Sequence, residues 1–234
     1  MKRLSLLTLV FAVAFTFFLI GPVFLNKPFD VYPLIKTGDV FDIVTPLVLI
    51  PLYWLLFWNV SNKAPGLKGT IIFLIFAAFW VEGQGMHLAA NSIGHWLNGI
   101  EGTDIYNVEY FYDEVLGHYL WHFGIIGLSA LLISQEWRNL YILEYASSWL
   151  TNLAGVIHGF TFFLIAVEGQ TTLMSVPFPI LITLFVLLFG RSRMRRQPLL
   201  RFFFISYLIA TLCFAGWGIY WPGLPEFSKV GIID

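Results

Sequence analysis

The chain has 234 residues, of which 58% are hydrophobic, 18% aromatic and only 12% charged, and its formal net charge is -1. Soluble domains carry about 25% charged residues, so this composition excludes a water-soluble fold, which would leave too much apolar surface uncovered. With a mean hydropathy of +0.78, the sequence predicts an integral membrane protein surrounded by the lipid bilayer. The net charge itself says nothing about nucleic acid, but the chain has no soluble basic domain, so we predict no nucleic-acid partner.

The first apolar stretch runs over residues 4–25 and follows Lys2 and Arg3. It is longer than the apolar region of a signal peptide, which has about 7–15 residues, and no small-residue cleavage site follows it. We therefore predict a retained first transmembrane helix.

Six further apolar stretches approach the length needed to cross a bilayer, which is roughly 20 residues. Together they predict an all-α bundle of about seven spans, with short links, in one membrane domain over residues 1–234. The predicted spans are 4–25, 40–60, 70–97, 110–133, 141–167, 174–189 and 202–221.

Lys and Arg are distributed unequally between the two sets of span ends. Because cytoplasmic loops carry the excess of basic residues, we predict a cytoplasmic N-terminus, an external C-terminus and a multi-pass location, in the plasma membrane if the source is prokaryotic. The run 191–196 is interpreted as a topology determinant rather than as a specific anionic-lipid site. The basic set holds Lys2, Arg3, Lys63, Lys68, Arg138, Arg191, Arg193, Arg195, Arg196 and Arg201, and the other set holds Lys27, Lys36 and Lys229.

All five histidines lie on the third, fourth and fifth predicted spans. Ionisable groups inside a membrane are costly and usually face the bundle interior, so this concentration indicates a functional site. On the third span, His87, Asn91 and His95 recur every four residues and share a helical face with Gln84. A kink or a close helix contact is expected at the glycines beside Glu82.

The fourth span carries a second stripe, in which Glu114, His118 and His122 recur every four residues. On a straight α-helix Asp113 faces away from this stripe, so it is expected to complement the helix dipole. The fifth span contributes His158, and Glu168 lies at its outer boundary. We expect the polar faces of the three spans to meet.

A common depth is predicted for three of the histidines. At 1.5 Å per residue, His87, His118 and His158 lie roughly 6–8 Å from the midplane toward the outer face. Glu82 and His122 lie near the midplane.

Imidazole and carboxylate ligands from separate helices are typical of metal sites in helix bundles. We predict a divalent metal ion, zinc first and iron second, held by His87, His118, His122 and His158. Glu82 and Glu114 are the candidate catalytic residues, as ligand or general base. The supporting set is Gln84, Asn91, His95, Asp113 and Glu168. The predicted function is a metal-dependent enzyme, a hydrolase first and an oxidoreductase second, acting on a lipid or apolar small-molecule substrate.

The segment Gly83-Gln84-Gly85-Met86-His87, followed by Asp113-Glu114, resembles in part the seven-helix membrane hydrolases related to alkaline ceramidases and adiponectin-receptor-type proteins. That resemblance implies a zinc site within a seven-helix bundle. The present chain departs from the family pattern because its HxxxH pair, His118 and His122, shares a span with the aspartate and the last span has no histidine.

Two alternatives follow from the same residues. Two histidines on different helices could hold a haem, which would make the chain a haem- or quinone-binding redox module. Paired Glu and His side chains could instead relay protons in a transporter, or the chain could be a subunit with membrane-protein partners.

Overall fold

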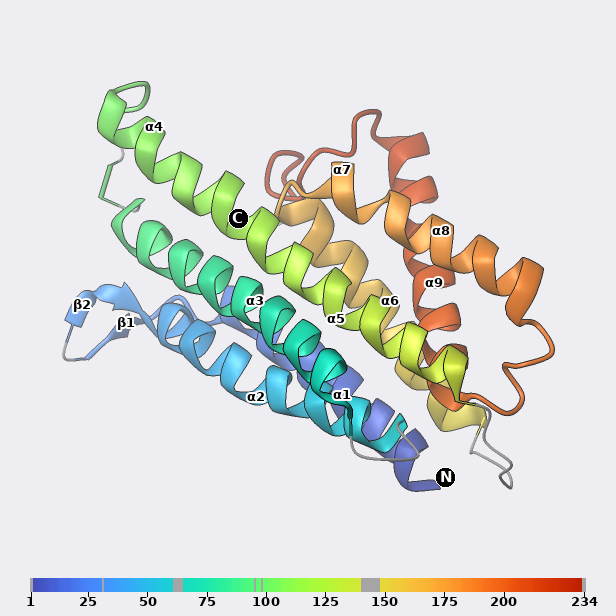
Figure 1. Ribbon diagram of the computed structural model, residues 1–234. Coiled ribbons are helices and arrows are strands. Elements are labelled where there is room, and N and C mark those ends of the chain that lie inside the picture. The colour runs from blue at the N-terminus through green and yellow to red at the C-terminus, as the bar shows by residue number, and fades with distance from the viewer. Residues whose placement is uncertain are drawn as a thin grey trace.

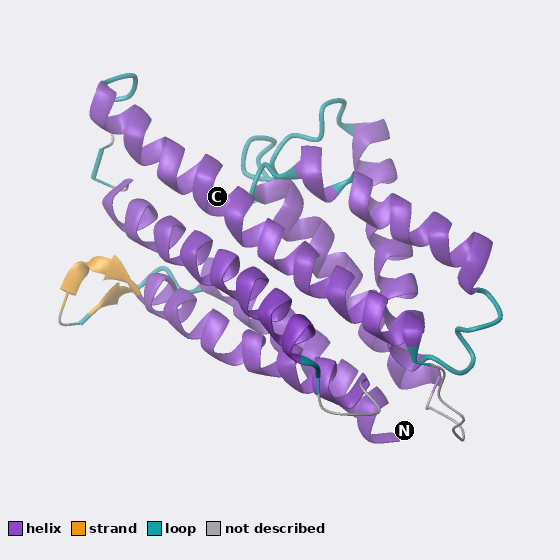
Figure 2. Cartoon of the chain, in the orientation of Figure 1, coloured by secondary structure: helices purple, strands orange, loops and turns teal. Residues whose placement is uncertain are grey.

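The computed structural model describes residues 2–30, 32–60, 65–94, 96–97, 99–139 and 148–232. Within these ranges the long elements are all helices, and one short β-hairpin lies between the first two (Figures 1 and 2). In chain order the elements are α1 (Lys2–Ile20), η1 (Gly21–Phe24), β1 (Pro28–Phe29), β2 (Tyr32–Lys36), α2 (Thr37–Val60), α3 (Leu67–Gly94), α4 (Asp104–Tyr110), η2 (Phe111–Gly117), α5 (His118–Arg138), α6 (Ser148–Glu168), α7 (Thr172–Ser175), α8 (Pro177–Phe185), η3 (Val186–Gly190) and α9 (Pro198–Tyr220).

Among the described residues, seven helical stretches are long and apolar enough to cross a membrane, which confirms the predicted all-α bundle of about seven spans. The fourth stretch is longer than predicted, because α4, the π-helical segment η2 and α5 run on as one rod over Asp104–Arg138. The antiparallel pairing of β1 with β2 was not predicted.

Two sets of helices form the bundle. Helix α6 packs between α1 and α9, while α3 lies along α5, and α2 joins the sets by contacting α1, α3 and α5 (Figure 1). Helix α8 packs on α9. We predicted that the polar faces of three spans meet. In the structure α3 and α5 pack along each other, whereas α6 packs mainly on α1 and α9.

Glycines set the spacing between α3 and α5. A Cβ atom on Gly83 would lie 2.4 Å from the backbone nitrogen of Trp121 and 2.6 Å from the carbonyl oxygen of Gly117. One on Gly124 would lie 2.7 Å from the backbone nitrogen of Trp80. The close contact predicted near Glu82 is thus present, and α3 remains helical through it.

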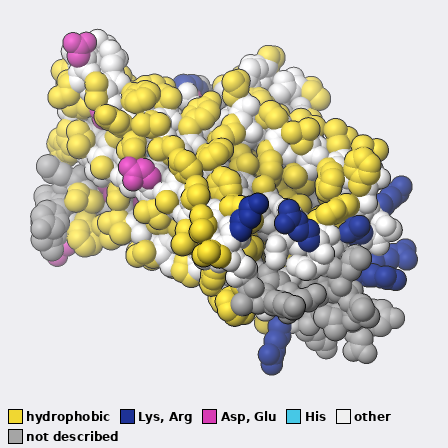
Figure 3. Space-filling model, viewed as in Figure 1, with side chains coloured by type: hydrophobic (Ala, Val, Ile, Leu, Met, Phe, Trp, Pro, Cys, Tyr) yellow, Lys and Arg dark blue, Asp and Glu magenta, His cyan; other side chains and the backbone are white. Residues whose placement is uncertain are grey.

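The two ends of the bundle differ in the sign of their charged side chains. Arg138, Arg191 and Arg195 lie at the end where α1 begins, which we call the basic end, and Figure 3 shows Lys and Arg side chains gathered there. Asp39, near the start of α2, and Asp104, at the start of α4, lie at the opposite, acidic end. The site described next lies toward the acidic end.

Candidate functional site

The centre of the site is a contact between His87 of α3 and Asp113 of η2. Nδ1 of His87 lies 2.6 Å from Oδ1 of Asp113, and the two side chains are only 18% and 8% exposed. The helices approach closely here because Gly117 has no side chain: a Cβ atom there would lie 3.1 Å from the backbone nitrogen of His87. The carboxylate thus lies against one nitrogen of the imidazole, and the His87 side chain also lines a cavity.

On a straight α-helix Asp113 is predicted to face away from the polar stripe, and the structure differs because residues 111–117 form a π-helix. A π-helix closes its hydrogen bonds from i to i+5, so counting at 3.6 residues per turn misplaces its side chains. Such segments frequently lie at functional sites.

His118 and Glu114 extend the centre along the same rod. The ring centroids of His87 and His118 are 4.5 Å apart, and Nδ1 of His118 lies 3.5 Å from Oε2 of Glu114. We call His87, Asp113, Glu114 and His118 the His–carboxylate cluster. Next along α5, His122 is fully buried, with its Nδ1 2.9 Å from the carbonyl oxygen of His118.

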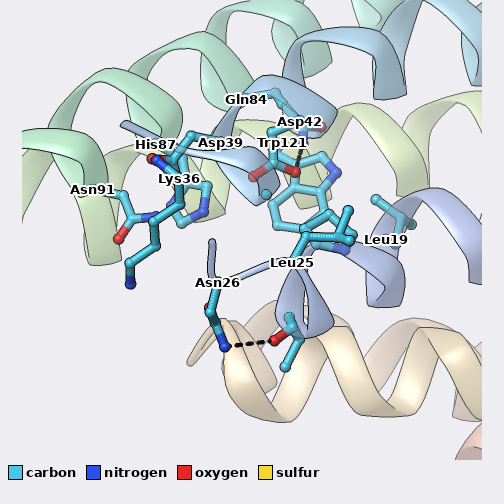
Figure 4. Close-up of a pocket in the computed structure, with 13 residues that line it drawn as sticks. Leu19, Leu25, Asn26, Lys36, Asp39, Asp42, Gln84, His87, Asn91 and Trp121 are labelled. Atoms are coloured by element: carbon cyan, nitrogen blue, oxygen red, sulfur yellow. Dashed lines mark hydrogen bonds between the residues drawn. The ribbon is translucent and has the colours of Figure 1, made fainter. Parts of the chain in front are cut away.

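A cavity of about 250 Å³ opens beside His87 (Figure 4). It lies where α1, β2, α2, α3 and α5 come together, so residues far apart in sequence line it. Its apolar lining is Leu19, Pro22, Val23, Leu25 and Trp121, and its polar lining includes Lys36, Asp39, Asp42, Gln84, His87 and Asn91.

A chain of hydrogen bonds holds Asp42 at this cavity. The indole N–H of Trp80 donates to Oε1 of Gln84 over 2.8 Å, and the Gln84 amide donates to Oδ1 of Asp42 over 3.2 Å. Asp42 is not among the site residues predicted from the sequence. The signal was nevertheless present, since an acidic residue inside a predicted span marks a functional site.

Trp121 also lines this cavity. Its side chain is 7% exposed, and its indole nitrogen has no hydrogen-bond partner among the described residues. A buried donor without a partner costs free energy. The nitrogen is itself buried, so the indole ring would have to turn before this donor could reach a ligand oxygen.

His158 lies apart from the cluster. Its Nδ1 is 2.7 Å from the hydroxyl oxygen of Ser206 on α9, and rings from α1 and α9 surround it, with the centroid of Phe15 4.4 Å away and that of Phe202 5.2 Å away. The cause is the packing of α6, because a Cβ atom on Gly159 would lie 2.0 Å from the Ser206 carbonyl oxygen. The predicted common layer of three histidines is thus reduced to His87 and His118.

The remaining predicted residues have separate surroundings. Gln84 and Asn91 line the cavity, whereas Glu82 is exposed on the outer face of α3. His95 lies outside the described residues. Oε2 of Glu168 accepts a hydrogen bond of 2.9 Å from the backbone of Phe227 and so anchors the segment after α9.

A second contact orders that segment. Lys229 donates a hydrogen bond to Glu226, and this bond raises the pKa of the Lys229 ammonium group. The Lys229–Glu226 contact is local to the segment, whereas the Glu168–Phe227 bond holds the segment at the end of α6. Glu168 therefore has a visible anchoring contact at the acidic end.

Within the described ranges, no three His, Cys, Asp or Glu side chains converge closely enough to hold a metal ion. Comparisons with protein-family models, with curated proteins and with solved structures found no match. The chemistry of the site therefore has to be argued from its own geometry.

Proposed function

We propose that the chain is a membrane-embedded hydrolase that acts on a lipid or other apolar substrate at the acidic end of the bundle. We further propose that this end faces the outside and that the N-terminus is cytoplasmic, as the distribution of Lys and Arg favours. The observation that carries the hydrolase proposal is the buried His87–Asp113 contact beside a cavity that a second carboxylate, Asp42, also lines.

His87 has the surroundings of a general base. Asp113 occupies Nδ1, fixing the ring orientation and stabilising the imidazolium that forms, so Nε2 is the nitrogen that accepts a proton. No Ser, Thr, Tyr or Cys is found among the described residues that line the cavity. Water is therefore the proposed nucleophile, with His87 removing its proton.

Asp42 and Trp121 complete the proposed arrangement. Gln84 holds the Asp42 carboxyl group at the cavity, where it could return a proton to the leaving group. Once its ring has turned, the Trp121 indole N–H, which lacks a partner, could donate to the oxygen on which negative charge develops. The apolar lining between these groups suits an amphipathic substrate that enters from the bilayer.

A divalent metal ion, with zinc preferred over iron, stays a proposal for the same cluster. His87, His118, Asp113 and Glu114 are imidazole and carboxylate donors of the type these ions take. Side-chain rotation would have to bring three of them together. The base role of His87 described above does not require the ion.

The test uses purified protein, a membrane lipid extract and ¹⁸O-labelled water. Hydrolysis puts the label into a released acid, which mass spectrometry detects. We expect product from the unmodified protein and a loss of about 100-fold or more for Asp113→Asn, since general-base catalysis contributes roughly 10²–10⁴-fold. Glu82→Gln is the matched acid-to-amide control on the exposed face and should retain full activity.

Four results would contradict this proposal or favour another. If Asp113→Asn and Glu82→Gln had equal activity, the proposed catalytic role of the His–carboxylate cluster would be contradicted. Metal analysis with an optical spectrum separates the alternatives: stoichiometric zinc or iron would favour the metal-dependent form, and a Soret band would favour the haem module. Lack of any labelled product across lipid classes would favour the transporter or subunit alternative.

A further inference from the structure

The basic end contains a concave surface formed by the link between η3 and α9. It encloses about 720 Å³ and is lined by Arg191, Ser192, Arg193, Arg195 and Arg196. A topology determinant needs only positive charge in a loop. Four arginines that line one concavity are more than that role requires.

One of the arginines is fixed in place by α5. Nη1 of Arg193 donates to the carbonyl oxygen of Trp137 over 3.0 Å, and its guanidinium carbon lies 4.2 Å from the centroid of the Trp137 ring. Stacking and hydrogen bonding hold the planar group in one orientation. The concavity therefore has a preorganised cation, beside which Arg195 and Arg196 are exposed.

Nothing in the described part of the chain neutralises this charge, because none of its carboxylates forms an ion pair with the four arginines. Glu136, a buried carboxylate near the end of α5, has a different partner: its Oε1 accepts a hydrogen bond of 3.2 Å from the backbone nitrogen of Leu199. Glu136 thus caps the start of α9. The arginines keep their positive charge for a ligand.

The neighbouring surface is apolar. Leu188 and Phe189 of η3, directly before the arginines, are 73% and 63% exposed. A ligand bound in the concavity therefore contacts the apolar surface of η3 on one side and several arginines on the other. A phospholipid with an anionic headgroup matches both, since arginine binds phosphate oxygens through paired N–H groups.

We propose that this concavity, which we call the arginine concavity, is a binding site for an anionic phospholipid of the cytoplasmic leaflet. The leaflet assignment rests on the orientation proposed above, and the site itself is independent of the hydrolase proposal. The phosphate lies among Arg193, Arg195 and Arg196, and the acyl chains lie along η3.

The test measures binding of dioleoyl phosphatidylglycerol to the detergent-solubilised full chain by native mass spectrometry, with phosphatidylcholine as the neutral comparison. Arg195→Gln/Arg196→Gln is compared with Arg3→Gln/Lys68→Gln, which removes the same charge from exposed positions of the same end. We expect the phosphatidylglycerol affinity to fall about tenfold or more in the first variant only, because each basic residue near an anionic surface contributes about 1 kcal/mol.

A conservative variant separates binding from topology. Arg195→Lys/Arg196→Lys keeps the charge that orients the protein but loses the paired N–H geometry, so we expect a severalfold loss of affinity. Lysine variants that bind as the unmodified protein does would overturn the proposal, as would equal losses in the two glutamine variants. It would also fail if phosphatidylcholine bound equally well, or if millimolar inorganic phosphate displaced the lipid, which would indicate a simple anion site.

Discussion

His87 and His158 differ in their access to solvent. His87 lines a cavity and contacts a carboxylate, whereas His158 is fully buried and its Nδ1 faces a serine hydroxyl group within a ring of aromatic side chains. A histidine that exchanges protons needs a route to water or substrate. The first therefore suits chemistry, and the second suits packing.

The His158–Ser206 pair gives the first prediction. Ser206→Ala leaves Nδ1 of His158 buried without its partner, so we expect a loss of about 1–3 kcal/mol in the free energy of unfolding. Adding His158→Phe removes the orphaned nitrogen and should recover part of that loss. Unfolding of the two single variants and the double variant in mixed micelles gives the coupling energy.

The same variants examine the sequence-based expectation that His158 is a metal ligand. If His158 only packs, the double variant keeps the metal content and the hydrolytic activity of the unmodified protein. If a folded double variant lost both its metal content and its hydrolytic activity, His158 would have to be counted among the site residues.

Residue types were more predictable than residue positions. Helical periodicity predicts the stripe of Glu114, His118 and His122. Glu114 and His118 belong to the His–carboxylate cluster, and His122 contacts the backbone of His118. Asp113 was misplaced because a π-helix cannot be recognised by counting at 3.6 residues per turn. Asp42 was overlooked because Gln84, which holds it at the cavity, lies on another helix and 42 residues away in the sequence.

At the scale of elements, the contact between α3 and α5 determines whether the cluster forms. His87 reaches Asp113 only if the two helices approach at Gly83, Gly117 and Gly124. Small residues permit such an approach inside membranes, where packing replaces the hydrophobic effect as the source of helix association.

The second prediction compares two glycines of one helix. Gly83→Ala places a methyl group against the backbone of α5, and we expect a loss of about 1–3 kcal/mol in the free energy of unfolding. Gly85→Ala meets nothing within 4 Å and should be neutral or stabilising by up to about 1 kcal/mol through helix propensity. Equal effects of the two substitutions in micelle unfolding would show that the helices do not touch at Gly83.

The existence of the helices was predictable and their neighbours were not. Length and hydropathy identify seven spans because a bilayer demands satisfied backbone groups over a fixed thickness. Periodicity gives the polar face of each span but does not say which helix it meets. The sequence therefore does not predict that the polar face of α6 packs on α9. In the structure Gly155 and Gly159 of α6 lie against the backbone of Phe202 and Ser206.

The whole molecule is polarised along the bundle. Arginines gather at the basic end, and the catalytic proposal uses carboxylates near the other end (Figure 3). A single orientation in the membrane would then give the two ends different partners. Anionic lipid would meet the arginine concavity, and the His–carboxylate cluster would meet substrate from the opposite leaflet.

The third prediction concerns that orientation. Basic residues resist translocation, so a reporter enzyme that folds only outside should be active when fused after Asp234 and inactive when fused before Met1. Lys27, Lys36 and Lys229 are the only Lys or Arg residues at the other set of ends and should not outweigh the ten basic residues. Reporter activity at the N-terminal fusion would show that the bundle has the opposite orientation in the membrane. The arginine concavity would then face the outer leaflet, so this one measurement also decides which lipids it meets.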